Sequence, residues 1–210
     1  MKLEIKSWPD GGPIPQRFAL GRIPAAGRFE FSENLNPALE WRDPPEGTKS
    51  FALVVDDPDV PSKPDDVNQE DRVVPPDLER VTFYHWVVVD IPAGMTAIAE
   101  GADSTAVTPK GKAPGPSSHG TTGINSYSDW FQGDPDMGGL YGGYDGPCPP
   151  WNDSIVHRYH FTLYALDVAT LGLSGPFTGA DVEAAIDGHV LASARHTGLY
   201  SMNPDVPVTA

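Results

Sequence analysis

Four side chains, carried by three short motifs, have the chemistry to bind a small ligand together. They are Asp57 in the Pro-rich motif at 56–61, His85 in the aromatic motif at 83–86, and the pair His157 and Tyr159. Imidazole N–H and phenol O–H groups donate hydrogen bonds, and a carboxylate can fix an imidazole tautomer or raise its pKa. These residue types predict a site for a small oxyanion.

Proline and strand periodicity are expected to fix these side chains in place. The motif at 56–61 holds two prolines and predicts a stiff turn directly after a strand. His157 is expected to begin a strand, in which Tyr159 shares its face at period two. The same period places His85 on the face of its strand opposite Trp86. Each motif also has a purely structural interpretation, as a strand-ending turn or a hydrogen-bonded core histidine.

Other kinds of site are less well supported by the sequence. An Asp with two His could bind zinc, but no fourth ligand has suggestive spacing, and Cys148 lies in the Pro-fixed bend at 146–150. No Gly-x-Ser-x-Gly nucleophile elbow occurs. We therefore expect no metal, no cofactor and no catalytic nucleophile.

The segments that must position these residues are mostly strands. Short runs rich in β-branched and aromatic residues lie at 51–55, 84–89 and 159–165, each bounded by Pro or Gly. With 22 Gly and 23 Pro in 210 residues, a helical bundle is disfavoured. No helical crossover separates the first two runs, which favours antiparallel pairing. The sequence predicts an all-β fold.

One peripheral helix is expected near residues 179–194. Thr178 and Asp181 resemble a capping box with Asp in place of Glu. Val182, Ala185 and Ile186 follow with helical spacing, although Gly188 weakens the pattern.

Residues 1–210 are expected to form a single domain with two long surface loops. The segment at 62–80 is polar, acidic and broken by prolines, which indicates a solvated loop. The segment at 108–142 is rich in Gly, Pro, Ser and Asp. Long loops in compact domains are often functional.

Charge and composition exclude several classes of partner. The formal net charge is -15, so nucleic-acid binding and attraction to an anionic membrane are disfavoured. A single cysteine permits no intrachain disulfide. No signal-like or membrane-spanning run of apolar residues is found, and we expect a cytoplasmic protein without stable membrane insertion.

At these motifs the sequence resembles the phosphatidylethanolamine-binding protein family, also called Raf kinase inhibitor-like proteins, and most resembles its bacterial branch. The resemblance rests on 57–61, His85-Trp86, and 146–150 with 157–159. Supporting stretches are 34–41, 45–53, 164–167 and 191–194, and the likeness extends from about residue 10 to about 202.

The resemblance implies a β-sandwich of antiparallel sheets with peripheral helices and a pocket for phosphate-like anions or phospholipid head groups. By motif match, the implied ligand-binding residues are Asp57, Asp59, Pro61, His85, Cys148, Pro149, His157 and Tyr159. Pro150 would also shape the wall. A homodimer is implied as well. Cys148 stands where eukaryotic members usually have Gly, and both long loops could extend over the pocket mouth.

The function expected from the sequence is non-enzymatic binding of a small anionic or phosphorylated ligand. Its affinity should weaken as pH rises past about 6.5 to 7, because a histidine must be protonated or correctly tautomerised. Two alternatives stay open. One is a protein-interaction or inhibitory module whose acidic loop 62–80 contacts a basic partner. The other is a hydrolase or lyase that uses a His–Asp pair.

Overall fold

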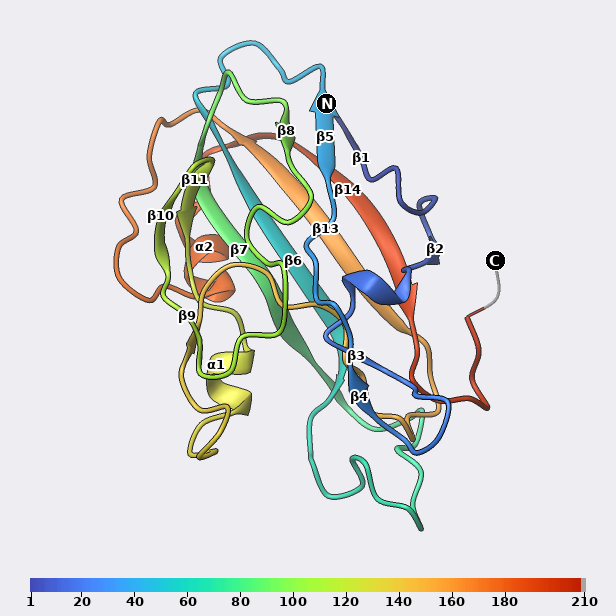
Figure 1. Cartoon of the computed structure of the whole chain (residues 1–210). Coiled ribbons are helices and arrows are strands. Elements are labelled where there is room, and N and C mark those ends of the chain that lie inside the picture. The colour runs from blue at the N-terminus through green and yellow to red at the C-terminus, as the bar shows by residue number, and fades with distance from the viewer. Residues whose placement is uncertain (209–210) are drawn as a thin grey trace.

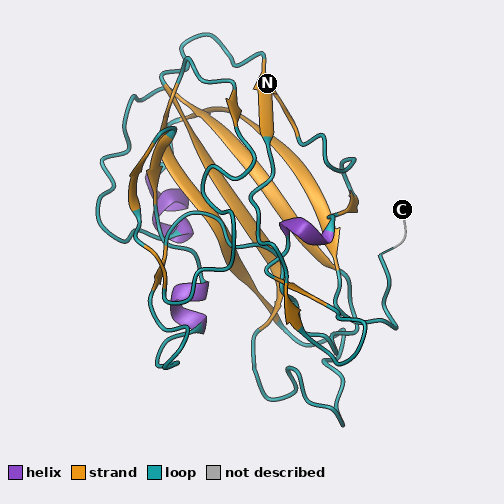
Figure 2. Cartoon of the chain, viewed as in Figure 1, coloured by secondary structure: helices purple, strands orange, loops and turns teal. Residues whose placement is uncertain are grey.

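The structure is a computed structural model that describes residues 1–208, and its regular secondary structure consists mainly of strands joined by long connections (Figures 1 and 2). A seven-stranded sheet has the order β10-β11-β7-β6-β13-β14-β2. Its strands are β2 (Gly12–Pro13), β6 (Ser50–Pro61), β7 (Arg80–Pro92), β10 (Gly115–Ser117), β11 (Gly120–Thr122), β13 (His157–Leu166) and β14 (Val190–Tyr200). All of its pairs are antiparallel except β14 with β2. The expected all-β fold and the antiparallel pairing of the first two runs are confirmed.

Smaller elements complete the fold. A three-stranded sheet has the order β1-β5-β8, and two strand pairs are β3 with β4 and β9 with β12. Their bounds are β1 (Lys2–Glu4), β3 (Gly21–Arg22), β4 (Glu30–Phe31), β5 (Leu39–Arg42), β8 (Ala97–Ile98), β9 (Gly111–Lys112) and β12 (Leu140–Tyr141). The helical segments are η1 (Gln16–Phe18), α1 (Tyr127–Trp130) and α2 (Gly179–Ala185).

The central strands are buried on both faces, which explains their almost continuous apolar runs. On one face, Leu53 of β6 and Trp86 of β7 pack with Trp41 of the small sheet, so the main core lies between the two sheets. On the other face, Val54 and Val87 belong to a second apolar cluster that also contains Val182 of α2. Figure 1 shows the small sheet and α2 on opposite sides of the long strands.

The helix expected at 179–194 begins as predicted but ends at Ala185. The Thr178–Asp181 capping box is present, and Val182 is fully buried. Gly188 then adopts a φ of 78° and turns the chain, and residues from Val190 onward form β14. The expected second half of the helix is wrong because β14 pairs with β13 along its length, and this ladder outweighs local helical spacing.

The stiff turn expected at 56–61 is also wrong. β6 continues through this motif to Pro61 and stays paired with β7, for example between Val60 and Val81. A register shift between Asp57 and Val60 accommodates Pro58, which has no N–H for the ladder. The acidic motif is therefore part of the sheet.

The two long loops contain more order than the sequence indicates. The segment at 108–142 includes β9 to β12 and α1. In the segment at 62–80, Asn152 donates to the carbonyls of Asp66, Gln69 and Arg72 at 2.8, 3.1 and 3.0 Å, and its Oδ1 accepts from Asn68 N–H at 2.9 Å. The buried side chain of Asn152 thus holds the backbone of this segment, while most of the acidic side chains of the segment remain in solvent.

Candidate functional site

A pocket of about 460 Å³ opens at the end of the molecule that carries α1, β4 and the 62–80 loop, the lower end in Figure 1. Asp57, His85, His157 and Tyr159 all line it, from strands β6, β7 and β13. Pro61, Cys148 and Pro149 lie in its wall, as does Pro150. The structure thus brings together the four side chains that the sequence predicts to cooperate.

The alternation of side chains along a strand explains why three of the four side chains, Asp57, His157 and Tyr159, face the pocket. Phe51, Leu53 and Val55 face the main core, and Asp57 continues the same face of β6. On β13, His157 and Tyr159 share a face, as predicted from their spacing.

The fourth placement, that of His85, corrects the prediction. In the β6–β7 ladder, Val55 pairs with Trp86 whereas Asp56 pairs with Tyr84, so His85 is an extra residue in a β-bulge. The bulge turns His85 to the same side of the sheet as Trp86, where its ring centroid lies 5.1 Å from that of Tyr159. The predicted opposite orientation is wrong because strict alternation fails at a bulge, a feature often found beside functional sites.

His157 is bonded to carboxylates through both ring nitrogens. Its Nδ1 donates to Asp57 at 2.8 Å and its Nε2 to Asp153 at 3.1 Å. Burial disfavours a charged ring, but the two carboxylates outweigh burial and raise the pKa of His157 to about 9. The ring is therefore a buried imidazolium, with no N–H left for a ligand.

Asp153 links this imidazolium to Arg80. The guanidinium donates two bonds to Asp153, at 2.6 and 3.0 Å. Burial favours the protonated acid, yet the bonds from His157 and Arg80 hold the pKa of Asp153 below its usual value. Two positive groups thus balance the carboxylates of Asp57 and Asp153, which stabilises this buried charge cluster.

His85 has one ring nitrogen available. Its Nδ1 lies 2.8 Å from the carbonyl oxygen of Asp145, and a carbonyl only accepts, so Nδ1 carries the hydrogen. Its Nε2 has no partner among the described residues. Burial lowers the pKa of His85, despite the opposing effect of Asp57. The neutral ring thus presents a lone pair to the pocket, and on protonation it would present a donor.

Tyr159 supplies the most direct indication of a missing ligand. Its side chain is 1% exposed, and its hydroxyl makes no hydrogen bond of ordinary geometry in the described part of the chain, although the Asp57 carboxylate lies close enough to act on it as an acceptor. Burial, and next the Asp57 carboxylate, raise the pKa of this phenol well above its ordinary value. A buried hydroxyl without a partner is unfavourable, so a donor in this position is suited to a ligand.

Asp59 departs from its implied pocket role, whereas Cys148 lies in the pocket wall as implied. Asp59 does not line the pocket; its carboxylate accepts two bonds from the Arg158 guanidinium, at 2.8 and 2.6 Å, and one from the Arg158 N–H. The register shift between Asp57 and Val60 interrupts the alternation of β6, and Asp59 is turned toward this arginine instead of the pocket. Cys148 is in the wall, but burial raises the pKa of its thiol to about 12, so it is not a thiolate at neutral pH.

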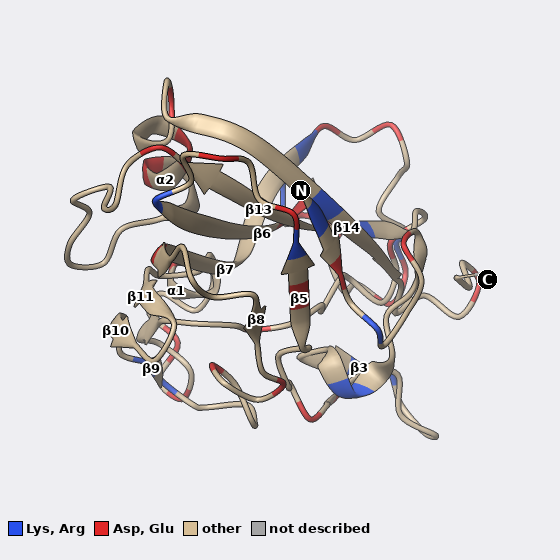
Figure 3. Ribbon diagram, turned by 90° about the horizontal axis from the view of Figure 1, so that it is seen from above, with Lys and Arg blue, Asp and Glu red and all other residues tan. Residues whose placement is uncertain are grey.

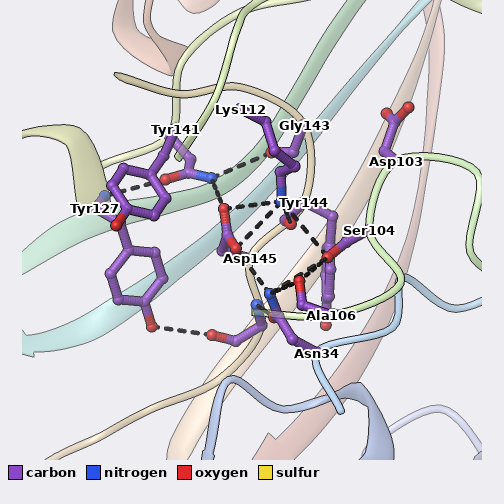
Figure 4. Close-up of polar contacts among 12 residues, drawn as sticks. Asn34, Asp103, Ser104, Ala106, Lys112, Tyr127, Tyr141, Gly143, Tyr144 and Asp145 are labelled. Atoms are coloured by element: carbon purple, nitrogen blue, oxygen red, sulfur yellow. Dashed lines mark hydrogen bonds and ion pairs between the residues drawn. The ribbon is translucent and has the colours of Figure 1, made fainter. Parts of the chain in front are cut away.

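The bend that carries Cys148 is held by a polar network around Asp145 (Figure 4). The Asp145 carboxylate accepts bonds from Asn34 at 2.8 Å, Asn125 at 2.9 Å and Lys112 at 3.2 Å. Asn34 also accepts from Gly146 N–H at 2.8 Å. A Cβ on Gly146 would overlap the Phe18 carbonyl oxygen, so this position requires glycine.

Sequence reasoning missed the residues that support the site. Asn34 begins a stretch that supported the resemblance and Asp145 directly precedes the motif at 146–150, but no role was predicted for either. Asp153, Arg80 and Asn152 gave no local signal, because their partners are distant in the sequence or lie in irregular backbone. The one available indication was a set of polar residues between the rigid bend and His157.

The described residues include no group of three or more His, Cys, Asp or Glu side chains that could hold a metal ion. Both nitrogens of His157 are occupied, so this histidine offers no lone pair for coordination. Within residues 1–208, no helix has the length and apolar character needed to cross a membrane.

Comparison with known proteins identifies the family. The family model described as phosphatidylethanolamine-binding protein matches residues 4–201. The chain belongs to the phosphatidylethanolamine-binding protein family. The resemblance inferred from the motifs is confirmed.

Similar proteins are found in Methanothermobacter thermautotrophicus and Escherichia coli. A UPF0098 protein of Methanothermobacter thermautotrophicus is 34% identical, over 95% of this chain and 98% of its own length. YbhB of Escherichia coli, also a UPF0098 protein, is 30% identical over 96% of this chain and 100% of its own length.

Two solved structures share the fold. The Escherichia coli protein YbcL has a TM-score of 0.67 and 25% identity, covering 95% of this chain and 97% of that one. A homologue from Chlamydia trachomatis, CT736, has a TM-score of 0.63 and 28% identity, covering 95% and 96%.

Proposed function

We propose that this chain binds a small ligand with an anionic or phosphorylated head in the pocket, and that it does so without chemical turnover. The observation that carries the proposal is the buried Tyr159 hydroxyl, which lacks a partner and lies in a pocket lining with His85. The family to which the chain belongs is named for binding a phospholipid. The homodimer and the protein partner expected from the sequence remain predictions.

The available donors favour a head that binds to Tyr159 and His85. The Tyr159 hydroxyl can donate as it stands, and His85 Nε2 donates once the ring is protonated. His157 is a positioning residue here, since its two N–H groups hold Asp57 and Asp153.

This assignment sets the pH dependence of anion binding. Burial lowers the pKa of free His85, and a bound anion would raise it. Anion affinity should therefore increase as pH falls through the interval between the free and bound pKa values. Affinity that weakens as pH rises is also what the sequence predicts. The group that titrates is His85, however, and its pKa in the free protein lies below the ordinary histidine value.

The same contacts argue against general acid–base chemistry by His157. Both of its nitrogens donate to carboxylates, so it has no free position from which to accept a proton from a substrate. The Cys148 thiol is protonated at neutral pH. We expect no hydrolysis of phosphate or carboxylate esters above the rate of a His85→Ala variant.

Calorimetric titration with inorganic phosphate and with phosphoethanolamine tests the proposal. Removing either donor, in His85→Ala or Tyr159→Phe, should weaken binding about tenfold or more, since a hydrogen bond to a charged ligand is lost. His189→Ala is the matched control, because His189 is half exposed and outside the pocket lining. Equal affinity in all four proteins would rule out this binding mode.

A further inference from the structure

Above its polar floor, the pocket is walled by apolar and aromatic side chains. The inner walls include Val60, Phe83 and Phe131. The rim carries Phe29, Phe31 and Trp130, which are 45%, 46% and 52% exposed. Large apolar side chains gathered around one opening indicate a binding surface, whereas singly scattered ones are ordinary.

A bare phosphate ion would leave most of this space empty. Phosphate contacting Tyr159 and His85 would occupy the floor of a pocket of about 460 Å³. Pockets of this size with apolar walls and a few polar groups suit ligands with an apolar body.

The 62–80 segment is a built wall of this upper space. Pro64, Val67 and Asn68 line the pocket. Asn152 holds the backbone around them through four hydrogen bonds, and Trp151 N–H donates to Asn68 Oδ1 at 3.0 Å. The wall is therefore pre-formed, which favours binding of a ligand without an ordering penalty.

Two of the segments that line the pocket also expose acidic side chains. The segment with Pro64 and Val67 also exposes Asp65, Glu70 and Asp71, and the segment with Trp130 exposes Asp129 and Asp136. Nearby basic groups are fewer: Lys63 is exposed, Arg72 pairs with Asp66 at 3.1 Å, and Arg28 stacks over Trp151. The local field at the mouth thus opposes negative charge on the outer part of a ligand.

We propose that the pocket contains a second, apolar subsite for an aryl or short alkyl group that carries no negative charge. The position of the polar head rests on the proposed function, with Tyr159 and His85 at the floor. The attached apolar group packs between Phe83, Phe131 and the Asn152-anchored wall, and its outer part contacts the rim residues Phe29 and Trp130. Its outer end, uncharged or cationic, lies between the two acidic segments.

Titration with inorganic phosphate, phenyl phosphate and benzyl alcohol separates this inference from the proposed function. Phenyl phosphate should bind at least about tenfold more tightly than phosphate, as expected for burying an aromatic ring. If phosphate binds and phenyl phosphate binds no better, the apolar subsite is wrong and the anion site stands. If benzyl alcohol binds but phosphate does not, the subsite stands and the anion site is wrong. If no compound binds, both are wrong.

Rim variants locate the apolar group. Trp130→Ser and Phe29→Ser should each reduce the advantage of phenyl phosphate over phosphate, because both side chains line the opening. Leu191→Ser is the matched control, since Leu191 is 41% exposed on β14 and does not line the pocket. These exposed positions leave the core intact, so folding is preserved. An unchanged advantage in both rim variants would place the aryl group elsewhere.

Paired ligands test the charge preference. At low salt, 4-carboxyphenyl phosphate should bind several-fold more weakly than 4-methylphenyl phosphate, and added salt should narrow the difference. The double variant Asp129→Asn, Asp136→Asn should narrow it as well. Equal or tighter binding of the carboxylate at low salt would overturn the charge preference.

Discussion

At the scale of single residues, the site is defined by which polar atoms are already bonded. His157 has no N–H free for a ligand, whereas Tyr159 has a buried hydroxyl with no partner and His85 has one free nitrogen. Three side chains that could all donate hydrogen bonds to a ligand thus have different roles. The distinction follows from their neighbours and not from their types.

Tyr159→Phe should separate stability from binding. Deleting an unpartnered buried hydroxyl removes no hydrogen bond within the protein, so the free energy of unfolding should stay within about 1 kcal/mol or rise. Ligand affinity should fall at the same time. Urea denaturation of the free protein, set beside the titrations, measures both. A large loss of stability would show that the hydroxyl has an internal partner.

At the scale of elements, one bulge and one anchored segment shape the pocket. The bulge in β7 brings His85 onto the face that carries Asp57 and Tyr159. Asn152 holds the 62–80 segment as a wall, and this segment leads into Arg80, which binds Asp153. The 62–80 segment, which forms one wall of the pocket, is therefore connected through Arg80 and Asp153 to His157 at the pocket floor.

Asn152→Ala should loosen the wall more than the rest of the protein. Loss of the hydrogen bonds from a buried amide to this segment should lower the free energy of unfolding by about 2–4 kcal/mol. Tryptic cleavage after Arg72 should also accelerate in the folded state. Gln132→Ala, in an exposed turn, is the control. Cleavage at the rate of the unaltered protein would contradict anchoring by Asn152.

Thr178→Ala tests the opposite side of the sheet. The Thr178 hydroxyl caps α2 by accepting from Asp181 N–H at 3.3 Å, and losing such a cap typically lowers stability by about 1 kcal/mol. α2 contributes to the second apolar cluster and lines no part of the pocket, so ligand affinity should not change. Thermal unfolding and titration of the same sample provide the comparison. A change in affinity would reveal coupling between the two faces.

At the scale of the whole molecule, the large negative charge is distributed over the loops (Figure 3), while the interior balances its own charges. The buried imidazolium of His157 is part of that balance. Its pKa of about 9 in the folded protein compares with an ordinary value of 6.5. Because the folded value is higher, protonation stabilises the folded state below the ordinary pKa, and this contribution is lost as pH rises.

The free energy of unfolding should therefore decline between about pH 6.5 and pH 9, by an amount of the order of 3 kcal/mol. Urea denaturation across this interval measures the decline. The His189→Ala variant should show the same decline in stability. The Asp153→Asn variant should show a smaller decline, because one of the two carboxylates that raise the pKa of His157 becomes a neutral amide. A flat profile in the unaltered protein would contradict the buried imidazolium.

The sequence by itself determined the strand runs at 51–55, 84–89 and 159–165, the antiparallel pairing of the first two, the cap of α2 and the shared face of His157 and Tyr159. These features depend on residues a few positions apart, where side-chain periodicity and turn chemistry act directly. Gathering of the four candidate side chains was also predictable, through motifs that together mark the family.

Only the tertiary structure decided which of those side chains remain free. The orientation of His85 depends on the pairing of Tyr84 and Trp86 with β6. The second ring nitrogen of His157 is occupied because Asp153 accepts its hydrogen bond, and Arg80 in turn binds Asp153. Residues 190–200 likewise form a strand, and not the expected end of a helix, because they pair with β13. In each case the deciding free energy comes from hydrogen bonds and charges between segments far apart in the chain, which local sequence patterns do not encode.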